Sequence, residues 1–146
     1  MLRTLLLLLP IVWCCAFSTG FESRTEALNY LNNSNIWVAG MPEYNLDDRK
    51  GVLHIKLQTK GSFTTYHLNL AQVEGGMQDS KGVVSVSMSC GKGNCILVKT
   101  SLETLARPNA TLVMQSTFED GDYREDYLEK GSKIAEAINY LSKFYK

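Results

Sequence analysis

Two closely spaced cysteines place the strongest constraint on how this chain can fold. Cys90 and Cys95 are separated by four residues, the turn-forming segment Gly-Lys-Gly-Asn at 91–94. Cysteines with this spacing can lie opposite each other across a β-hairpin, where Cα atoms about 4.5–5.5 Å apart allow a disulfide. We therefore predict a Cys90–Cys95 disulfide at the tip of a hairpin whose strands are residues 83–90 and 95–100.

The two thiols also allow other interpretations. A free or regulatory pair of thiols is one, although four intervening residues differ from the two-residue spacing of redox motifs. A zinc site that combines both cysteines with His54 and His67 is another, since such side chains are common zinc ligands. Because an oxidising compartment favours the S–S bond, we expect a structural disulfide and no bound metal.

The beginning of the chain has the pattern of a signal peptide. A basic residue is followed by an apolar run at 5–13, which is too short to span a bilayer. Cleavage is expected after Ala16, with Gly20 as the alternative site, and a retained membrane anchor is the other interpretation. We predict that residues 1–20 are a signal peptide, that residues 21–146 form a single domain, and that the protein is secreted or periplasmic.

Alternating apolar and polar residues predict an antiparallel sheet. In the predicted strand 52–58, leucine and isoleucine at 53, 55 and 57 alternate with polar residues at 54, 56 and 58. Turns rather than helices separate such segments, so neighbouring strands should be antiparallel. Residues 40–50 are predicted to be a loop, and Gly75-Gly76 and residues 79–82 to be flexible connections. The five or six expected strands are 52–58, 63–70, 83–90, 95–100, 110–118 and the short segment 36–38.

A helix is predicted at each end of the domain. The first begins after Ser23, an N-cap residue with Glu26 three positions later, as in a capping box. In the longer second helix, Gly131 marks either a close approach or a break, and we expect the helix to be continuous. Its apolar stripe consists of Tyr127, Ile134, Ile138, Leu141 and Tyr145. Such a stripe should lie against the sheet, which makes the predicted fold class α+β.

The charge pattern excludes several classes of function. Fifteen acidic residues balance fifteen basic ones, so no overall field attracts nucleic acid. The basic residues are dispersed and lack the interleaved aromatic residues of single-strand binding proteins. After the signal peptide, no segment of the sequence is long and apolar enough to cross a bilayer. We predict no nucleic-acid partner and no stable membrane span after signal cleavage.

No residues identify a catalytic centre. His54 and His67 lie on polar strand faces and can share one exposed face. A catalytic pair would also need a nucleophile or a carboxylate beside it, and the sequence does not indicate one. The acidic run at 119–126 lacks the spacing of a calcium loop and suits the start of a helix. We therefore predict no catalytic residues, no metal and no cofactor.

Three aromatic residues are candidates for a ligand groove. Trp37, Tyr44 and Tyr66 can line such a groove, and the alternative is that they belong to the core and its rim. Together with His54 and His67 they are the binding candidates of this sequence. Asn32 and Asn109 also begin glycosylation acceptor sequences, whose use depends on the source of the protein.

Four segments together resemble a known family, the small exported bacterial proteins with a pleckstrin-homology-like domain. The segments are Thr-Glu-Ala-Leu-Asn-Tyr-Leu at 25–31, His-Leu-Asn-Leu-Ala-Gln-Val at 67–73, the strand that runs into the cysteines at 83–96, and Ala-Glu-Ala-Ile-Asn-Tyr-Leu at 135–141. The resemblance implies a strongly bent antiparallel sheet or partly open barrel that the C-terminal helix covers at one end. It also implies docking of peptides or lipid headgroups. Lys56 and Lys60 are too few basic residues for a phosphoinositide pocket, and the family has no catalytic residues to transfer.

The leading functional hypothesis is an exported, non-catalytic module that binds a peptide or another protein. A small-molecule carrier of the lipocalin type is the alternative, and it requires an interior that Ile134, Ile138 and Leu141 leave vacant. A small hydrolase or accessory enzyme is the third hypothesis. It requires a carboxylate within hydrogen-bond distance of His54 or His67.

Overall fold

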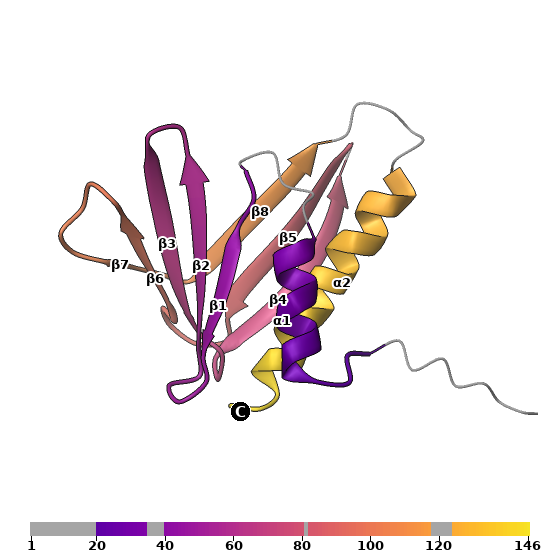
Figure 1. Ribbon diagram of the computed structural model, residues 1–146, viewed down its shortest axis with the longest axis horizontal. Coiled ribbons are helices and arrows are strands. Elements are labelled where there is room, and N and C mark those ends of the chain that lie inside the picture. The colour runs from indigo at the N-terminus through magenta and orange to yellow at the C-terminus, as the bar shows by residue number, and fades with distance from the viewer. Residues whose placement is uncertain (1–19, 35–39, 81, 118–123) are drawn as a thin grey trace, which may run out of the picture.

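The computed structural model describes residues 20–34, 40–80, 82–117 and 124–146 (Figure 1). In these residues two helices accompany eight strands, and all paired strands are antiparallel. The fold class is therefore α+β, as predicted. The elements are α1 (Arg24–Asn33), β1 (Glu43–Asp47), β2 (Val52–Thr59), β3 (Ser62–Asn69), β4 (Val73–Ser80), β5 (Val83–Cys90), β6 (Ile96–Thr100), β7 (Arg107–Asn109), β8 (Thr111–Thr117) and α2 (Arg124–Ser142).

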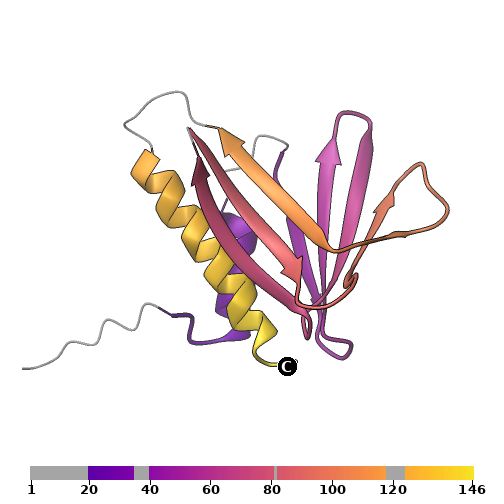
Figure 2. The same cartoon turned by 180° about the vertical axis from the view of Figure 1, so that it is seen from behind.

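The strands form two sheets that share a corner. The larger sheet has the order β1-β2-β3-β6-β7, the smaller one has the order β4-β5-β8, and the described strands do not close into a barrel. Ala110 alone separates β7 from β8, so the chain passes from one sheet to the other within a single residue. Figure 2 shows the two sheets diverging and α2 lying along the smaller sheet. The predicted single sheet is thus two sheets joined at a corner.

One hydrophobic core fills the space between the two sheets and the helices. The apolar residues at odd positions of β2 and at even positions of β5 are buried, as their alternation predicts. Tyr44 on β1 reaches across this core, and its hydroxyl lies 3.8 Å from the sulfur of Met114 on β8. The largest fully buried side chains are those of Leu31, Leu53, Ile55, Leu68, Leu70, Met88, Ile96, Ile134, Ile138, Leu141, Val73 and Val84.

Helix α2 is continuous through Gly131, which confirms the prediction. A Cβ atom at this position would lie 2.7 Å from Cγ1 of Val84, so the glycine allows the helix to approach β5 closely. Ile134, Ile138 and Leu141 are fully buried in the common core. A carrier of the lipocalin type would need an interior that these three side chains leave vacant. Here they are part of the packed core instead.

The predicted loop at 40–50 is wrong in its central part, because β1 occupies Glu43–Asp47 and pairs with β2. The inward-facing residues are the buried Tyr44 and the half-buried Leu46, which alternate with exposed residues. Two inward side chains are too few to give a clear period in the sequence, so this strand depends on its pairing with β2.

The flexible connection predicted at Gly75-Gly76 is also wrong, because both glycines lie inside β4, which pairs with β5 along its whole length. A Cβ atom at Gly75 would lie 2.8 Å from the carbonyl oxygen of Ala135 in α2. The glycine is present because the helix packs directly on the strand backbone. Of the residues predicted to form the connection at 79–82, Gly82 alone is described outside the strands, and it has a positive φ of 85°.

Other predictions concern residues outside the described ones. These are the signal peptide, of which Gly20 alone is described, the strand at 36–38, and most of the acidic run. The end of that run, Glu125 and Asp126, lies in the first turn of α2, where carboxylates complement the helix dipole. The predicted first helix is confirmed, and Oγ of Ser23 accepts a hydrogen bond from the N–H of Glu26 at 3.1 Å.

Two asparagine side chains bind one outer edge of each sheet. The N–H of Tyr44 on β1 donates to Oδ1 of Asn32 at 2.8 Å, and Nδ2 of Asn32 donates to the Tyr44 carbonyl at 3.0 Å. On β4, the N–H of Gly75 donates to Oδ1 of Asn139 at 2.8 Å, and Nδ2 of Asn139 donates to the Gly75 carbonyl at 2.9 Å. In each case a helix satisfies both backbone groups that a further strand would bind.

Ser116→Ala is expected to increase the free energy of unfolding by about 1 kcal/mol. The Ser116 side chain of β8 is fully buried, and its hydroxyl has no hydrogen-bond partner among the described residues. Removing the hydroxyl avoids the loss of hydration that folding imposes on it. Urea unfolding followed by circular dichroism measures the change. A decrease in stability would show that the hydroxyl has a partner in solution.

Candidate functional site

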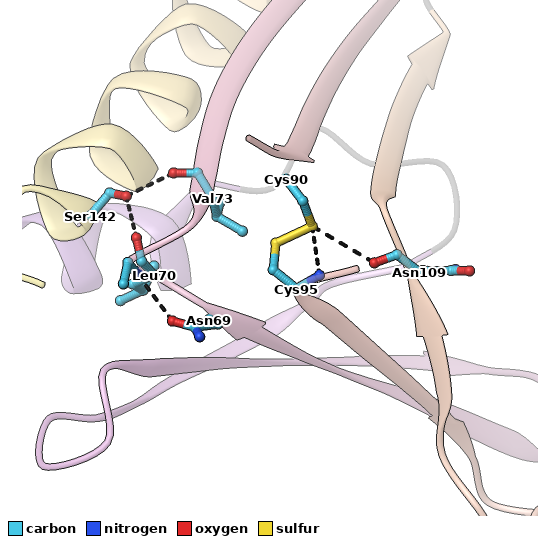
Figure 3. Close-up of a disulfide and its surroundings, with 8 residues drawn as sticks. Asn69, Leu70, Val73, Cys90, Cys95, Asn109 and Ser142 are labelled. Carbon is cyan, nitrogen blue, oxygen red and sulfur yellow. Dashed lines mark hydrogen bonds between the residues drawn. A yellow bond between two sulfur atoms is a disulfide. The ribbon is translucent and has the colours of Figure 1, made fainter. Parts of the chain in front are cut away.

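The predicted disulfide is present, but it does not lie at the tip of a hairpin. Cys90 and Cys95 form an S–S bond of 2.08 Å with their Cα atoms 5.6 Å apart. Cys90 ends β5, whereas Cys95 immediately precedes β6, which pairs with β3 and β7 in the other sheet. The bond therefore connects the two sheets (Figure 3). The predicted pairing of residues 95–100 with residues 83–90 is wrong, because β4 and β8 occupy both sides of β5.

Backbone hydrogen bonds hold both cysteines of the disulfide in place. The N–H of Cys95 donates to the sulfur of Cys90 at 2.9 Å, and the N–H of Cys90 donates to the carbonyl of Ala110 at the corner between the sheets (2.9 Å). Both thiols are consumed by the bond, so they are not zinc ligands. The part of the chain that the structure describes contains no group of three or more histidine, cysteine or acidic side chains that could hold a metal.

The two histidines are closer than the sequence predicts. His54 on β2 and His67 on β3 are direct cross-strand partners on the outer face of the larger sheet. Their Nδ1 atoms are 2.6 Å apart and their rings meet edge to face. One imidazole donates and the other accepts, which requires at least one neutral ring. Among the described residues, neither imidazole forms a hydrogen bond or an ion pair with a carboxylate.

The stability of the fold should decrease as the pH falls from 8 to about 5.5. Partial burial, His54 across the strand and Lys99 on β6 together lower the pKa of His67. The unfolded state therefore takes up this proton first. The stabilisation that is present above the ordinary histidine pKa is lost as the pH falls from that pKa through the lower pKa of the folded state. We expect a change of about 0.5 kcal/mol, typical of like charges paired across strands. Urea unfolding at the two pH values measures it, and His67→Gln should reduce the difference.

The aromatic candidates do not share a groove. Trp37 lies outside the described residues. Tyr44 is buried in the core, and Tyr66 is half-buried at the edge of that core, where burial raises the pKa of its hydroxyl. Both side chains occupy the inner face of the larger sheet, because their cross-strand partner Ile55 is buried there. The core interpretation therefore describes Tyr44, and the rim interpretation describes Tyr66.

A groove of about 710 Å³ runs along α2 and β4. The exposed face of the helix forms its floor. The first residues of the described chain and the middle of β4 line it as well. The lining residues are Gly20, Phe21, Gly75, Gly76, Met77, Ser132, Ala135, Glu136, Asn139, Tyr140 and Lys143.

The free edge of β4 is exposed to this groove. Hydrogen-bonding direction alternates along an antiparallel strand, so Val73, Gly75, Met77 and Asp79 all direct their backbone groups away from β5. Ser142 contacts the carbonyl of Val73 at 2.8 Å, and Asn139 binds both groups of Gly75. The next outward pair, at Met77, has no hydrogen bond to a described residue. The sequence does not predict this groove, because its residues carry no motif.

Comparisons with known proteins found no matching family model, no similar curated protein and no similar solved structure. The resemblance to the pleckstrin-homology-like proteins therefore stays a prediction. Among the described helices, none combines the length and the apolar composition that a bilayer span requires.

Proposed function

We propose that this protein is an exported, non-catalytic module that binds an extended segment of another protein along the free edge of β4. The observation that carries the proposal is the pair of hydrogen bonds between the Asn139 amide and Gly75. An amide in this position is bound as the peptide group of a neighbouring strand would be. The Asn139 amide occupies the pairing position at Gly75, so an incoming strand would pair with the edge of β4 from Met77 onward.

The residues beyond Gly75 support this mode of binding. Met77 directs an N–H and a carbonyl toward the groove, so an incoming segment can continue the sheet from this residue. The half-buried side chains of Met77 and Tyr140 offer apolar contacts for alternate residues of the segment. Glu136 and Lys143, which line the same groove, supply one charge of each sign. Backbone pairing gives affinity in such sites, and the side-chain contacts give specificity.

The proposal includes export from the cytoplasm and a pleckstrin-homology-like fold. A disulfide between the sheets is compatible with an oxidising compartment outside the cytoplasm, where such bonds persist. Docking of peptides is also what the resemblance to pleckstrin-homology-like proteins implies. Two sheets at an angle, with a C-terminal helix along one of them, are compatible with a partly open barrel of that kind.

Selection of random peptides on the purified protein tests the proposal. Met77→Pro removes the outward N–H without touching the hydrogen bonds between β4 and β5, and it should weaken the selected peptide about tenfold. Gln115→Pro is the matched control, because Gln115 directs its N–H to the free side of β8, the other outer strand of the same sheet. Equal binding by the two variants would contradict strand addition at β4.

Methylation of the peptide nitrogens provides a second measurement. A segment that pairs with β4 directs every second N–H toward the strand, so N-methylation should weaken binding at alternate residues. Tolerance of methylation at all positions, or the absence of any selected sequence, would show that the groove does not bind an extended segment.

A further inference from the structure

A second exposed surface lies at the end of the molecule farthest from α2 (Figure 1). It is formed by the turn between β2 and β3 and by the loop between β6 and β7. We call it the apolar tip and define it by Phe63, Leu102 and Leu105. Leu102 is 88% exposed, Leu105 is 79% exposed and Phe63 is 41% exposed. Isolated exposed leucines are ordinary, but three large apolar side chains on adjoining loops form a surface that water solvates poorly.

The loop that carries the leucines is held in a defined conformation by its own polar groups. The N–H of Glu103 donates to the carbonyl of Thr100 at 3.1 Å, and the N–H of Thr100 donates to the carboxylate of Glu103 at 3.2 Å. Arg107 forms an ion pair with the same carboxylate at 2.8 Å. These bonds turn the polar groups of the loop toward each other. The two leucine side chains are left pointing into solvent.

Hydrogen bonds also join this loop to the β2–β3 turn. The N–H of Ser101 donates to the carbonyl of Phe63 at 2.8 Å, and the N–H of Phe63 donates to Oγ of Ser101 at 3.3 Å. Phe63 and Leu102 therefore belong to one continuous tip rather than to two independent loops.

Basic residues surround the apolar tip. Lys56, Lys60 and Lys99 are exposed, and Nζ of Lys56 lies 4.9 Å from the centre of the Phe63 ring. Glu103 is neutralised by Arg107, and Glu43, the partner of Lys56 in register, forms no ion pair with it. This end of the molecule is therefore positive, although the whole chain has no net charge.

We propose that the apolar tip is a contact site for anionic membranes, in which Leu102 and Leu105 enter the interface and the three lysines contact lipid headgroups. The charge complementarity favours a lipid surface over a protein partner, because apolar side chains ringed by cations match a hydrocarbon layer beneath anionic headgroups. Each lysine should strengthen binding about fivefold and each leucine about tenfold, which gives a reversible contact.

Co-sedimentation of the purified protein with vesicles tests the proposal. Binding is expected with vesicles of phosphatidylcholine and phosphatidylglycerol, and it should weaken with salt. Leu102→Asp with Leu105→Asp should weaken binding about a hundredfold, and Lys60→Glu about fivefold or more. Val113→Asp is the control, because Val113 is 52% exposed on β8, away from the tip, and this variant should bind as the unchanged protein does.

Three results would overturn the proposal. One is the absence of sedimentation with anionic vesicles, and another is an equal loss of binding in the Val113→Asp control. The third is self-association of the unchanged protein that the double leucine variant abolishes, because the tip would then be an interface between copies. Circular dichroism melting verifies that the variants are folded, and Leu102→Asn with Leu105→Asn repeats the test without added charge. Peptide binding at β4 should persist in all tip variants, so the two proposals fail separately.

Discussion

Gly75→Ala is expected to lower the free energy of unfolding by about 2–3 kcal/mol. The added Cβ would lie 2.8 Å from the carbonyl oxygen of Ala135 and 3.2 Å from Cβ of Ile138, and neither atom can rotate away. Helix α2 must therefore move away from β4, which also strains the hydrogen bonds between Gly75 and Asn139. Urea unfolding followed by far-ultraviolet circular dichroism measures the loss.

Gly76→Ala is the matched control for this substitution. The added Cβ would point to the opposite face of β4, where its nearest neighbour is Oγ of Ser87 at 3.2 Å, a small group that can rotate. The expected change is within about 0.5 kcal/mol, as for most surface substitutions. An equal loss of stability from both variants would mean that the helix does not pack on the strand at Gly75.

Replacing both cysteines with serine is expected to lower the free energy of unfolding by about 2 kcal/mol. The closed loop is short, since Cys90 and Cys95 are five positions apart, and the entropy removed from the unfolded chain is correspondingly small. The double variant also removes the sulfur that accepts a hydrogen bond from the N–H of Cys95. Urea unfolding under non-reducing conditions measures the effect.

A reductant provides the control for the cysteine substitutions. It should destabilise the unchanged protein by a similar amount and leave the double serine variant unaffected. Intact-mass analysis of residues 20–146 after non-reducing alkylation gives an independent result. Two alkylated thiols would contradict the disulfide.

The elements that the sequence predicts correctly are those that local rules determine. Helix α1 begins after Ser23 because this residue caps the helix, and β5 is correctly placed because valines alternate with serines. The stripe on α2 is correct for Ile134, Ile138 and Leu141, since burial of one helical face follows from the spacing of its apolar residues. Tyr127 is half-buried, and Tyr145 lies beyond the end of the helix at Ser142. One departure is that the Glu26 carboxylate accepts from the N–H of Glu22, rather than from that of Ser23 as in a standard capping box.

The errors arise where pairing between distant segments decides the structure. Residues 95–100 alternate as a partner of β5 should, but β4 and β8 already occupy both sides of that strand. This segment forms β6, which pairs with β3 instead, and the disulfide therefore lies between the two sheets. Gly75 and Gly76 indicate a turn in isolation, and only the position of α2 explains why they lie inside a strand. Contacts of this kind are not encoded in any local period.

The candidate sites also divide into those that local sequence patterns predict and those that depend on contacts between distant segments. The cysteine partners and the shared face of His54 and His67 follow from spacing and alternation, and the structure confirms both. The groove beside β4 and the apolar tip depend on the arrangement of separate segments. Leu102 and Leu105 lie in a loop whose conformation is determined by hydrogen bonds to Glu103, so the sequence alone does not show that they are exposed.

The asparagine contacts at β1 and β4 reduce the backbone that each strand edge offers to another chain. A bare strand edge can template the addition of further chains and so lead to aggregates. Asn32 and Asn139 end the hydrogen-bonded ladder with a side chain, which an approaching copy cannot extend. Beyond Gly75 the unprotected stretch borders the groove along α2, so its access is limited by the helix. The contacts of Asn32 and Asn139 therefore shorten the open ladder on β1 and β4, and on β4 they leave the backbone groups of Met77 available beside the helix.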